Sequence, residues 1–439
     1  MISVGFRFKN LPITQKSIVI NAIIMFFWWI AFNPGFFSGD SFGILEIVKS
    51  GKLSSELTIF WAVIVKIITI NGNHPEFATL VFSQIFGVSI SIFSNTLFKG
   101  KIALWSSAVL CLTPLVGAMG ITLWHDIPMT SGFLLTVVGF YRIVKQERHA
   151  FTLLLIGLTL SAFRYNGIPT LLLTCLIFFI LNRKKSVAVV FVIICIFSLM
   201  SSTLNSYFDP KISTFSDGMV NWMRYDISCY AASTSDKTFY TKEFSGRTTK
   251  EYWASSQACT WFNDSQAFRD RSEFDTSKIP RAWLALTLEN PIFVLTTHLK
   301  RHAYLNPIPL YGKPKIPFIH TTIEYSGRGI QFLNPKLSES LRTYPRIWNY
   351  FNFVFGYSGF WLLLICLFAW KRKSSIYFGI GILGLVLNSG LFVFAIISDA
   401  RFSLFVLVAA QLIAIGEILK YTSERKLLIS NKSLTRNIR

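Results

Sequence analysis

Acidic residues are scarce in this chain. Its 439 residues hold 22 Asp and Glu against 43 Lys and Arg, which gives a formal net charge of +21. In a soluble protein, such an excess would suggest a nucleic-acid partner. Here the cations collect at the ends of apolar runs, which is the signature of cytoplasmic loops in a membrane protein. The charge pattern therefore favours membrane lipids over nucleic acid as the partner.

Several other features are missing. No glycine-rich phosphate loop occurs, so nothing indicates a soluble nucleotide substrate. No internal repeat is visible, although repeated halves are typical of transporters. Cysteines number only six, and Cys111, Cys175, Cys195 and Cys366 lie inside apolar runs, as small core residues do. The missing phosphate loop counts against a nucleotide-dependent enzyme, and the missing repeat counts against a transporter.

Long apolar runs dominate what is present. Hydrophobic residues make up 52% of the chain, and runs long enough to cross a bilayer recur along it. The runs are unbroken rather than alternating, so we expect helices and not the strands of a barrel. The first run lacks a small-residue cleavage site and is expected to stay as the first helix. The predicted fold class is an all-α polytopic membrane protein.

Clusters of cations between the runs predict the topology. If every cluster lies in the cytoplasm, an even number of spans must separate neighbouring clusters. Counting runs long enough to cross gives about ten transmembrane helices with both termini inside. They cover 17–33, 76–97, 102–121, 128–144, two short helices in 150–182, 186–206, 348–370, 374–397 and 401–420. Residues 57–70 and 282–306 are expected to lie along the membrane, the second broken at Glu289-Asn290-Pro291.

One long polar segment, residues 207–285, differs from the other loops. It carries ten acidic and ten basic residues, whereas the rest of the chain carries 12 and 33. Balanced charge in a long loop indicates an external cap. Its cysteines, Cys229 and Cys259, either pair in an oxidising compartment or remain two free thiols. We divide the chain into a transmembrane module with a catalytic first external loop (1–206), an external cap with an interfacial helix (207–345), C-terminal transmembrane helices (346–421) and a basic cytoplasmic tail (422–439).

Ionisable residues gather at the predicted outer turns. Such residues at membrane depth are costly, so their default interpretation is functional. Structural alternatives exist for each, because the aspartates could be helix N-caps and the arginines headgroup anchors. Their coincidence on one face favours a site. The members are Asp40 after the first span, His125 and Asp126 between the third and fourth, Arg164 between the two short helices, and Arg401 beside Asp399 before the last span.

Transfer of a group from a lipid phosphate is the chemistry that suits these residues. A carboxylate at the interface can act as general base and deprotonate an acceptor hydroxyl. Arginines can hold the leaving phosphate as its charge grows in the transition state. His298 and His302 have the i, i+4 spacing of a metal-binding pair, but no third ligand accompanies them, so surface histidines are favoured.

Short motifs in the same order resemble those of the GT-C-fold membrane glycosyltransferases that use polyprenyl-phosphate sugars. Each motif is weak alone, and the ordered set spans residues 33–402. The motifs are Pro34-Gly35-x-x-x-x-Asp40-Ser41, Trp124-His125-Asp126-Ile127-Pro128, Arg164-Tyr165-Asn166-Gly167, Asn290-Pro291 leading into Lys300-Arg301, and Arg401-Phe402.

The resemblance implies a role for each matching residue. Asp40 would be the catalytic base, and Asp126 a second acidic residue that positions the acceptor or a metal. The residues near the donor phosphate would be Arg164, Arg401, His125, Lys300 and Arg301. Family members often carry an Asp-Glu pair or a His-Pro-Pro element in the first external loop. This chain has a displaced His74-Pro75-Glu76 instead, which leaves dependence on a divalent metal open and assigns no cofactor.

The sequence thus predicts an integral membrane glycosyltransferase. It would move a sugar from a polyprenyl-phosphate donor to a cell-envelope glycan or lipid acceptor, on the external face of a bacterial inner membrane. One alternative is a polysaccharide polymerase or ligase that acts on lipid diphosphates and depends less on an aspartate base. The other alternative is a lipid or solute transporter, for which ionisable residues near the bilayer midplane are expected.

Overall fold

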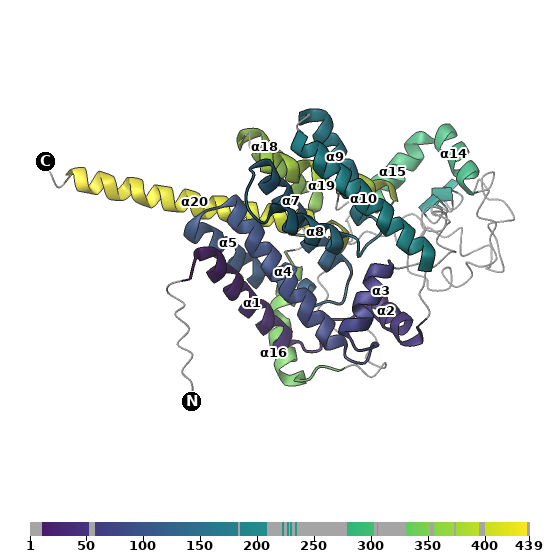
Figure 1. Ribbon diagram of the computed structural model, residues 1–439, viewed down its shortest axis with the longest axis horizontal. Helices are drawn as coiled ribbons and strands as arrows, with labels where there is room; N and C mark the ends of the chain where they lie inside the picture. The colour runs from purple at the N-terminus through teal and green to yellow at the C-terminus, as the bar shows by residue number, and fades with distance from the viewer. Residues whose placement is uncertain are drawn as a thin grey trace.

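The computed structural model is helical in the part of the chain that it describes (Figure 1). The described residues are 11–51, 58–182, 185–208, 222–223, 226–227, 229–230, 233–234, 279–302, 305, 331–351, 355–372, 375–394 and 400–436.

Six helices in the described part are long and apolar enough to cross a membrane. The pair α5 (Gly100–Leu112) and α6 (Pro114–Gly120), bent by 64°, adds a seventh span at most. The chain is therefore a multi-pass, all-α membrane protein, and the expected ten spans are not confirmed. The six helices are α1 (Ile13–Ala31), α4 (Pro75–Leu97), α7 (Asp126–Val144), α10 (Lys185–Phe208), α19 (Ser375–Phe394) and α20 (Leu404–Arg436).

Short helices account for the difference between ten expected spans and six or seven. The predicted break at residues 164–167 is present and separates α8 (Ala150–Ser161) from α9 (Gly167–Asn182). The predicted span 348–370 begins later, as α18 (Ser358–Arg372). At 1.5 Å per residue, helices of 12, 16 and 15 residues reach roughly 18–24 Å, less than the ~30 Å hydrocarbon core.

Five further helices are too short or too polar to span. The segments predicted to lie along the membrane form α3 (Ile59–Ile68), α14 (Ile279–Glu289) and α15 (Pro291–Arg301), with the break at Asn290 where it was expected. The loop that follows α1 contains α2 (Gly39–Ser50). Another amphipathic helix, α16 (Pro335–Asn349), packs on α1 and α6.

The helical body holds one large apolar core, and a smaller one lies under α14 and α15. In Figure 1, α1 and α4 run side by side, and α14 and α15 lie at the opposite end of the molecule from the protruding end of α20. The predicted tail from residue 422 continues α20 as helix to Arg436. The smaller core consists of Ile227, Tyr230, Ile279, Leu286 and Val294.

Polar side chains join α1 to its neighbours within the apolar body. Asn21 donates to the Ser91 hydroxyl of α4 at 2.7 Å. The hydroxyls of Ser17 and Ser107 lie 3.0 Å apart, between α1 and α5. Buried polar groups between membrane helices find partners across the interface, because lipid offers none. These hydrogen bonds fix how α1, α4 and α5 pack.

Glycines allow α7 and α8 to approach closely. A Cβ added at Gly139 would lie 2.6 Å from the backbone nitrogen of Leu154, and one at Gly132 would lie 2.5 Å from that of Ser161. Both distances are shorter than any normal contact. Small residues at such positions let membrane helices pack backbone against backbone. The close α7–α8 pair holds the start of α7 near the turn that follows α8.

Candidate functional site

The loop that follows α1 is bonded to the residues that precede α7. The Phe36 amide donates to the Ile121 carbonyl at 3.2 Å, and the Leu123 amide donates to the Phe36 carbonyl at 3.1 Å. Gly35 makes this approach possible, since a Cβ there would lie 2.5 Å from the Ile121 oxygen, and its φ is +114°. Two segments far apart in sequence therefore form one rigid unit.

Serines in this loop set the start of α2. Ser38 is the N-cap, and it forms a reciprocal capping box with Ser41. The Ser41 hydroxyl also donates to the Leu123 carbonyl at 2.9 Å, and the Trp124 indole donates to the Ser38 hydroxyl at 2.7 Å. Asp40 lies in the first turn of α2. The alternative that Asp40 is the helix cap is therefore wrong.

Asp40 pairs with Arg401 across the molecule. The Arg401 Nη1 lies 2.7 Å from the Asp40 Oδ2. The Asp40 side chain is 51% exposed, whereas that of Arg401 is 11% exposed. The Arg401 guanidinium lowers the pKa of Asp40 below its ordinary value; burial opposes this, and the charge of Arg164 adds to the lowering. Asp40 is thus an ionised carboxylate with one side open.

A second carboxylate, Asp126, pairs with Arg164. Arg164 lies in the turn between α8 and α9, and its Nη1 contacts the Asp126 Oδ1. Asp126 is fully buried at the start of α7, where His125 is the N-cap residue and no side chain caps the helix. The alternative that Asp126 is the cap is therefore also wrong. Thr58, the N-cap of α3, supports the turn by donating to the Phe163 carbonyl at 2.9 Å.

The two arginines stack on one aromatic ring. The guanidinium carbon of Arg164 lies 4.4 Å from the Phe402 ring centroid, and that of Arg401 lies 5.0 Å from it. Arg401 also lies 4.8 Å from the Trp124 ring. Cations over aromatic faces are attracted by the ring quadrupole. Both arginines face inward toward carboxylates and rings, which is not the placement of headgroup anchors.

Residues Asp40, His125, Asp126, Arg164 and Arg401 are called the paired-arginine cluster below. Burial, together with the charge of Arg164, holds the pKa of His125 well below its ordinary value, so its imidazole is neutral. Its Nε2 lies 3.9 Å from the Asp126 Oδ2. Two carboxylates and two guanidiniums therefore balance in formal charge. Asp399, which the sequence places beside Arg401, lies outside the described residues.

Lys300 and Arg301 lie elsewhere among the described residues. Arg301 is 3% exposed and its Nη2 lies 3.0 Å from the Asp226 Oδ1. Lys300 is exposed on α15. No ion pair between described residues joins either of them to the paired-arginine cluster. Their role at a donor phosphate stays a prediction.

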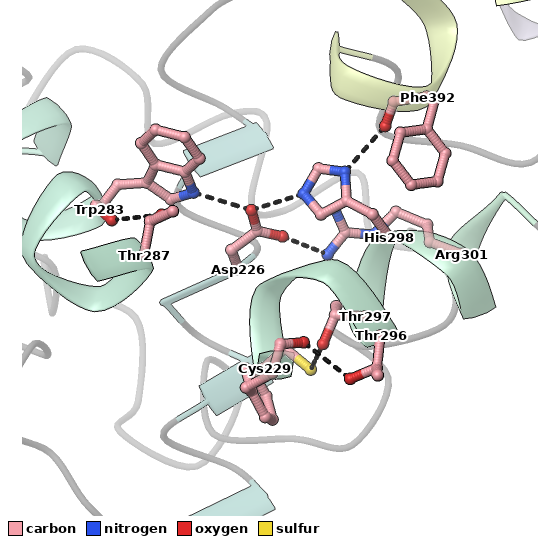
Figure 2. Close-up of polar contacts among 10 residues, drawn as sticks. Asp226, Cys229, Trp283, Thr287, Thr296, Thr297, His298, Arg301 and Phe392 are labelled. Atoms are coloured by element: carbon pink, nitrogen blue, oxygen red, sulfur yellow. Dashed lines mark hydrogen bonds and ion pairs between the residues drawn. The ribbon is translucent and has the colours of Figure 1, made fainter. Parts of the chain in front are cut away.

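Asp226, Trp283, His298 and Arg301 form a second group, called the Asp226 cluster below (Figure 2). Sequence reasoning missed Asp226, one of ten acids in a polar segment with no motif around it. It also placed His298 and His302 at the surface, but both are buried. The i, i+4 spacing that suggested a metal instead places both on the inner face of α15.

The described cysteines are of two kinds, one in a disulfide bond and four free. Cys229 is disulfide-bonded, whereas its predicted partner, Cys259, lies outside the described residues. The four cysteines of the apolar runs are free. Within the described part, no group of three or more His, Cys, Asp or Glu side chains could hold a metal ion.

Comparison with known proteins returns no relative: no family model, curated protein or solved structure matches the chain. The class that the fold defines is a multi-pass helical membrane protein. Function must therefore be argued from the two charged clusters.

Proposed function

We propose that this protein is an integral membrane glycosyltransferase that takes a sugar from a polyprenyl-phosphate donor. The acceptor is a glycan or lipid of the cell envelope, and transfer takes place on the external face of a bacterial inner membrane. A GT-C-like arrangement with about ten spans belongs to the same proposal, in which the short helices α8, α9 and α18 each cross the membrane. The observation that carries it is the half-exposed Asp40 carboxylate, held by Arg401 beside the less exposed Asp126, His125 and Arg164.

Asp40 is the base in this reaction. It takes the proton of the acceptor hydroxyl as the acceptor oxygen forms a bond to the sugar carbon that bears the phosphate. The bond from that carbon to the phosphate oxygen breaks, and the leaving phosphate keeps the electron pair. Attack from the side opposite the phosphate inverts the configuration at this carbon. An exposed carboxylate suits the role because the acceptor arrives from solvent.

Arginines receive the charge that develops on the leaving phosphate. Arg164 and Arg401 both lie within 5.0 Å of the Phe402 ring centroid, and in this proposal the phosphate is bound by both guanidiniums. A phosphate that binds Arg401 competes with Asp40 for it. Donor binding thereby weakens the interaction that lowers the pKa of Asp40, and the carboxylate becomes a stronger base once the donor is present.

Asp126 has a supporting role under this proposal. Its carboxylate is fully buried and pairs with Arg164, so it holds that arginine in place rather than contacting the acceptor. His125 is neutral and half-buried beside it, and can donate a hydrogen bond to a phosphate oxygen. The loop that follows α1 is fixed by the hydrogen bond between Trp124 and Ser38, and it keeps Asp40 close to the phosphate in this proposal.

The test is transfer of labelled sugar from polyprenyl-phosphate donors by membranes that contain Asp40→Asn. Transfer is expected to fall by at least about a hundredfold, because general-base catalysis contributes roughly 10²–10⁴-fold. Glu46→Gln, an exposed acid on the same helix, is the matched control and should keep full activity. Full activity of Asp40→Asn with lipid diphosphates would favour a polymerase or ligase. Movement of substrate without a glycosidic product would favour a transporter.

A further inference from the structure

Helix α3 ends in a left-handed turn at an isoleucine. Helices often end with a residue in the left-handed conformation, and this residue is usually glycine because glycine has no Cβ. In α3 the residue at that position is Ile70, whose φ is +51°. Its amide donates to the Ile67 carbonyl at 3.3 Å, and the next amide, that of Asn71, donates to the Lys66 carbonyl at 2.9 Å. These two hydrogen bonds define a Schellman motif.

Isoleucine is a costly residue at this position. The left-handed conformation brings the Cβ close to the following carbonyl oxygen, which lowers its population roughly tenfold for a residue with a side chain. A β-branched side chain adds to the crowding. The hydrophobic contact that often supports the motif would join Lys66 and Asn71 here, but both are polar and exposed. The Ile70 side chain is exposed as well, so packing inside the protein does not account for it.

Ile70 continues an exposed apolar stripe along α3. At about 3.6 residues per turn, positions 63, 67 and 70 share one face of the helix. Val63, Ile67 and Ile70 are all exposed on this face. Trp61 and Val65, on the opposite face, are buried in the large apolar core. Helix α3 therefore presents apolar side chains both to the core and outward.

The exposed stripe lies at the level where membrane helices end. Helix α1 has 19 residues, or roughly 28 Å, close to the ~30 Å hydrocarbon core. The Trp29 indole, in the last turn of α1, donates to the Glu76 carbonyl at 3.1 Å, so the first turn of α4 is level with the end of α1. Ile70 lies shortly before α4, which begins at Pro75, and α3 packs against α4. Phe77, in the first turn of α4, is also exposed. The stripe thus continues the lipid-facing surface of a membrane helix.

We propose that Val63, Ile67 and Ile70 form a lipid-contact stripe, through which α3 inserts shallowly into the acyl chains of the bilayer. Transfer of the Ile70 side chain from water to acyl chains offsets the cost of the left-handed turn. Lys66, beside the stripe, has a stem long enough to place its ammonium among the phosphate headgroups. Residues 57–70, expected from the sequence to lie along the membrane, thereby contact it through one defined face.

The other end of α3 reaches the paired-arginine cluster. The hydroxyl of Thr58, the N-cap residue, donates to the Phe163 carbonyl at 2.9 Å, and Phe163 precedes Arg164. The Trp61 ring meets the His125 ring edge to face, with the centroids 6.2 Å apart. Helix α3 thus connects the bilayer surface to the cluster. The lipid contact itself does not depend on the proposed function, whereas the consequence that it holds the arginines at the level of a lipid phosphate does.

Nitroxide labels report which solvent surrounds the lipid-contact stripe. The full-length protein is placed in nanodiscs of phosphatidylcholine and phosphatidylglycerol, in a background whose four free cysteines are replaced by alanine. One label is attached at Ile70→Cys, and the matched control is Asn73→Cys, an exposed polar position in the turn that follows. Oxygen is enriched in acyl chains, whereas a polar nickel chelate is excluded from them. The ratio of the collision rates with oxygen and nickel should be at least about fivefold higher at residue 70 than at residue 73.

Two reference labels calibrate this ratio. Ile23→Cys, exposed within the span α1, gives the value for acyl chains. Arg148→Cys, exposed in the turn between α7 and α8, gives the value for water. The background without an introduced cysteine supplies the blank. Ile67→Cys repeats the measurement on the same stripe if Ile70→Cys does not accumulate.

Ile70→Asn tests whether Ile70 itself contributes to insertion. Asn adopts the left-handed conformation more readily than Ile, so the turn is kept while the apolar group is lost. With the label at residue 67, the oxygen-to-nickel ratio should fall roughly twofold, because less apolar area inserts. Asn73→Ala leaves the stripe intact and should not change this ratio.

The outcomes separate this proposal from the proposed function. A ratio close to the Ile23 reference at residues 67 and 70 supports the lipid-contact stripe, even if the protein transfers no sugar, a result that would overturn the proposed function alone. A ratio as low as that of the Arg148 reference places the stripe in water and overturns it. Low collision rates with both reagents mean that protein covers the stripe, from this chain or from a second copy, and overturn it as well. An unchanged ratio in Ile70→Asn overturns the role of Ile70.

Discussion

Asp40 and Asp126 carry the same charge, but replacing each by Asn should affect a different property of the protein. Asp40 is 51% exposed and pairs with Arg401, whereas Asp126 is fully buried and pairs with Arg164. Replacing each by Asn keeps the volume and removes the charge. We expect Asp126→Asn to act on stability and Asp40→Asn on the reaction.

The burial of each ion pair sets the expected loss in the free energy of unfolding. Removing one partner of a buried ion pair costs roughly 3–5 kcal/mol, because the other charge stays buried and unpaired. Phe402 still faces the Arg164 cation in Asp126→Asn, and a desolvated cation–π contact is worth about 2 kcal/mol, so the lower end of that range is expected. Asp40 is half-exposed, and Trp124 and Phe402 still face the Arg401 cation after Asp40→Asn, so a smaller loss of about 1 kcal/mol is expected for this variant.

The assay is unfolding in mixed detergent micelles with increasing dodecyl sulfate, followed by tryptophan fluorescence. The chain holds 12 tryptophans, so the signal is large. The double variant Asp126→Asn/Arg164→Gln should be less destabilised than the sum of its single variants, since it leaves no unpaired charge. Wild-type stability of Asp126→Asn, or an equal loss for Asp40→Asn, would refute the reasoning from burial.

Three further outcomes are expected. Arg401→Gln removes the charge that lowers the pKa of Asp40, so the acid limb of the kcat/KM profile should move to higher pH, because a protonated Asp40 cannot accept the acceptor proton. Trp124→Phe loses the indole hydrogen bond to the N-cap serine of α2 and should cost about 1 kcal/mol in the micelle assay. Gly139→Ala puts a methyl group against the backbone of α8 and should destabilise by about 1–3 kcal/mol; Gly43→Ala, with open space around it, is the control and should not destabilise.

Sequence alone determined the helical membrane character of the protein. Apolar runs, basic loops and breaks are local properties, so the helices and the interruptions near residues 164–167 and at Asn290 could be found without a structure. The number of crossings could not be fixed in this way. Helices such as α8 and α18 are shorter than the bilayer core, and run length alone does not decide whether they cross.

Tertiary structure decided which charges meet. The sequence placed two carboxylates, a histidine and two arginines at neighbouring turns, but pairing Asp40 with Arg401 and Asp126 with Arg164 depends on helix packing between distant parts of the chain. Capping by Ser38, the stacking of both arginines on Phe402 and the burial of His298 against Asp226 arise in the same way. Side-chain direction and burial are set by neighbours from other helices, and no local pattern records them.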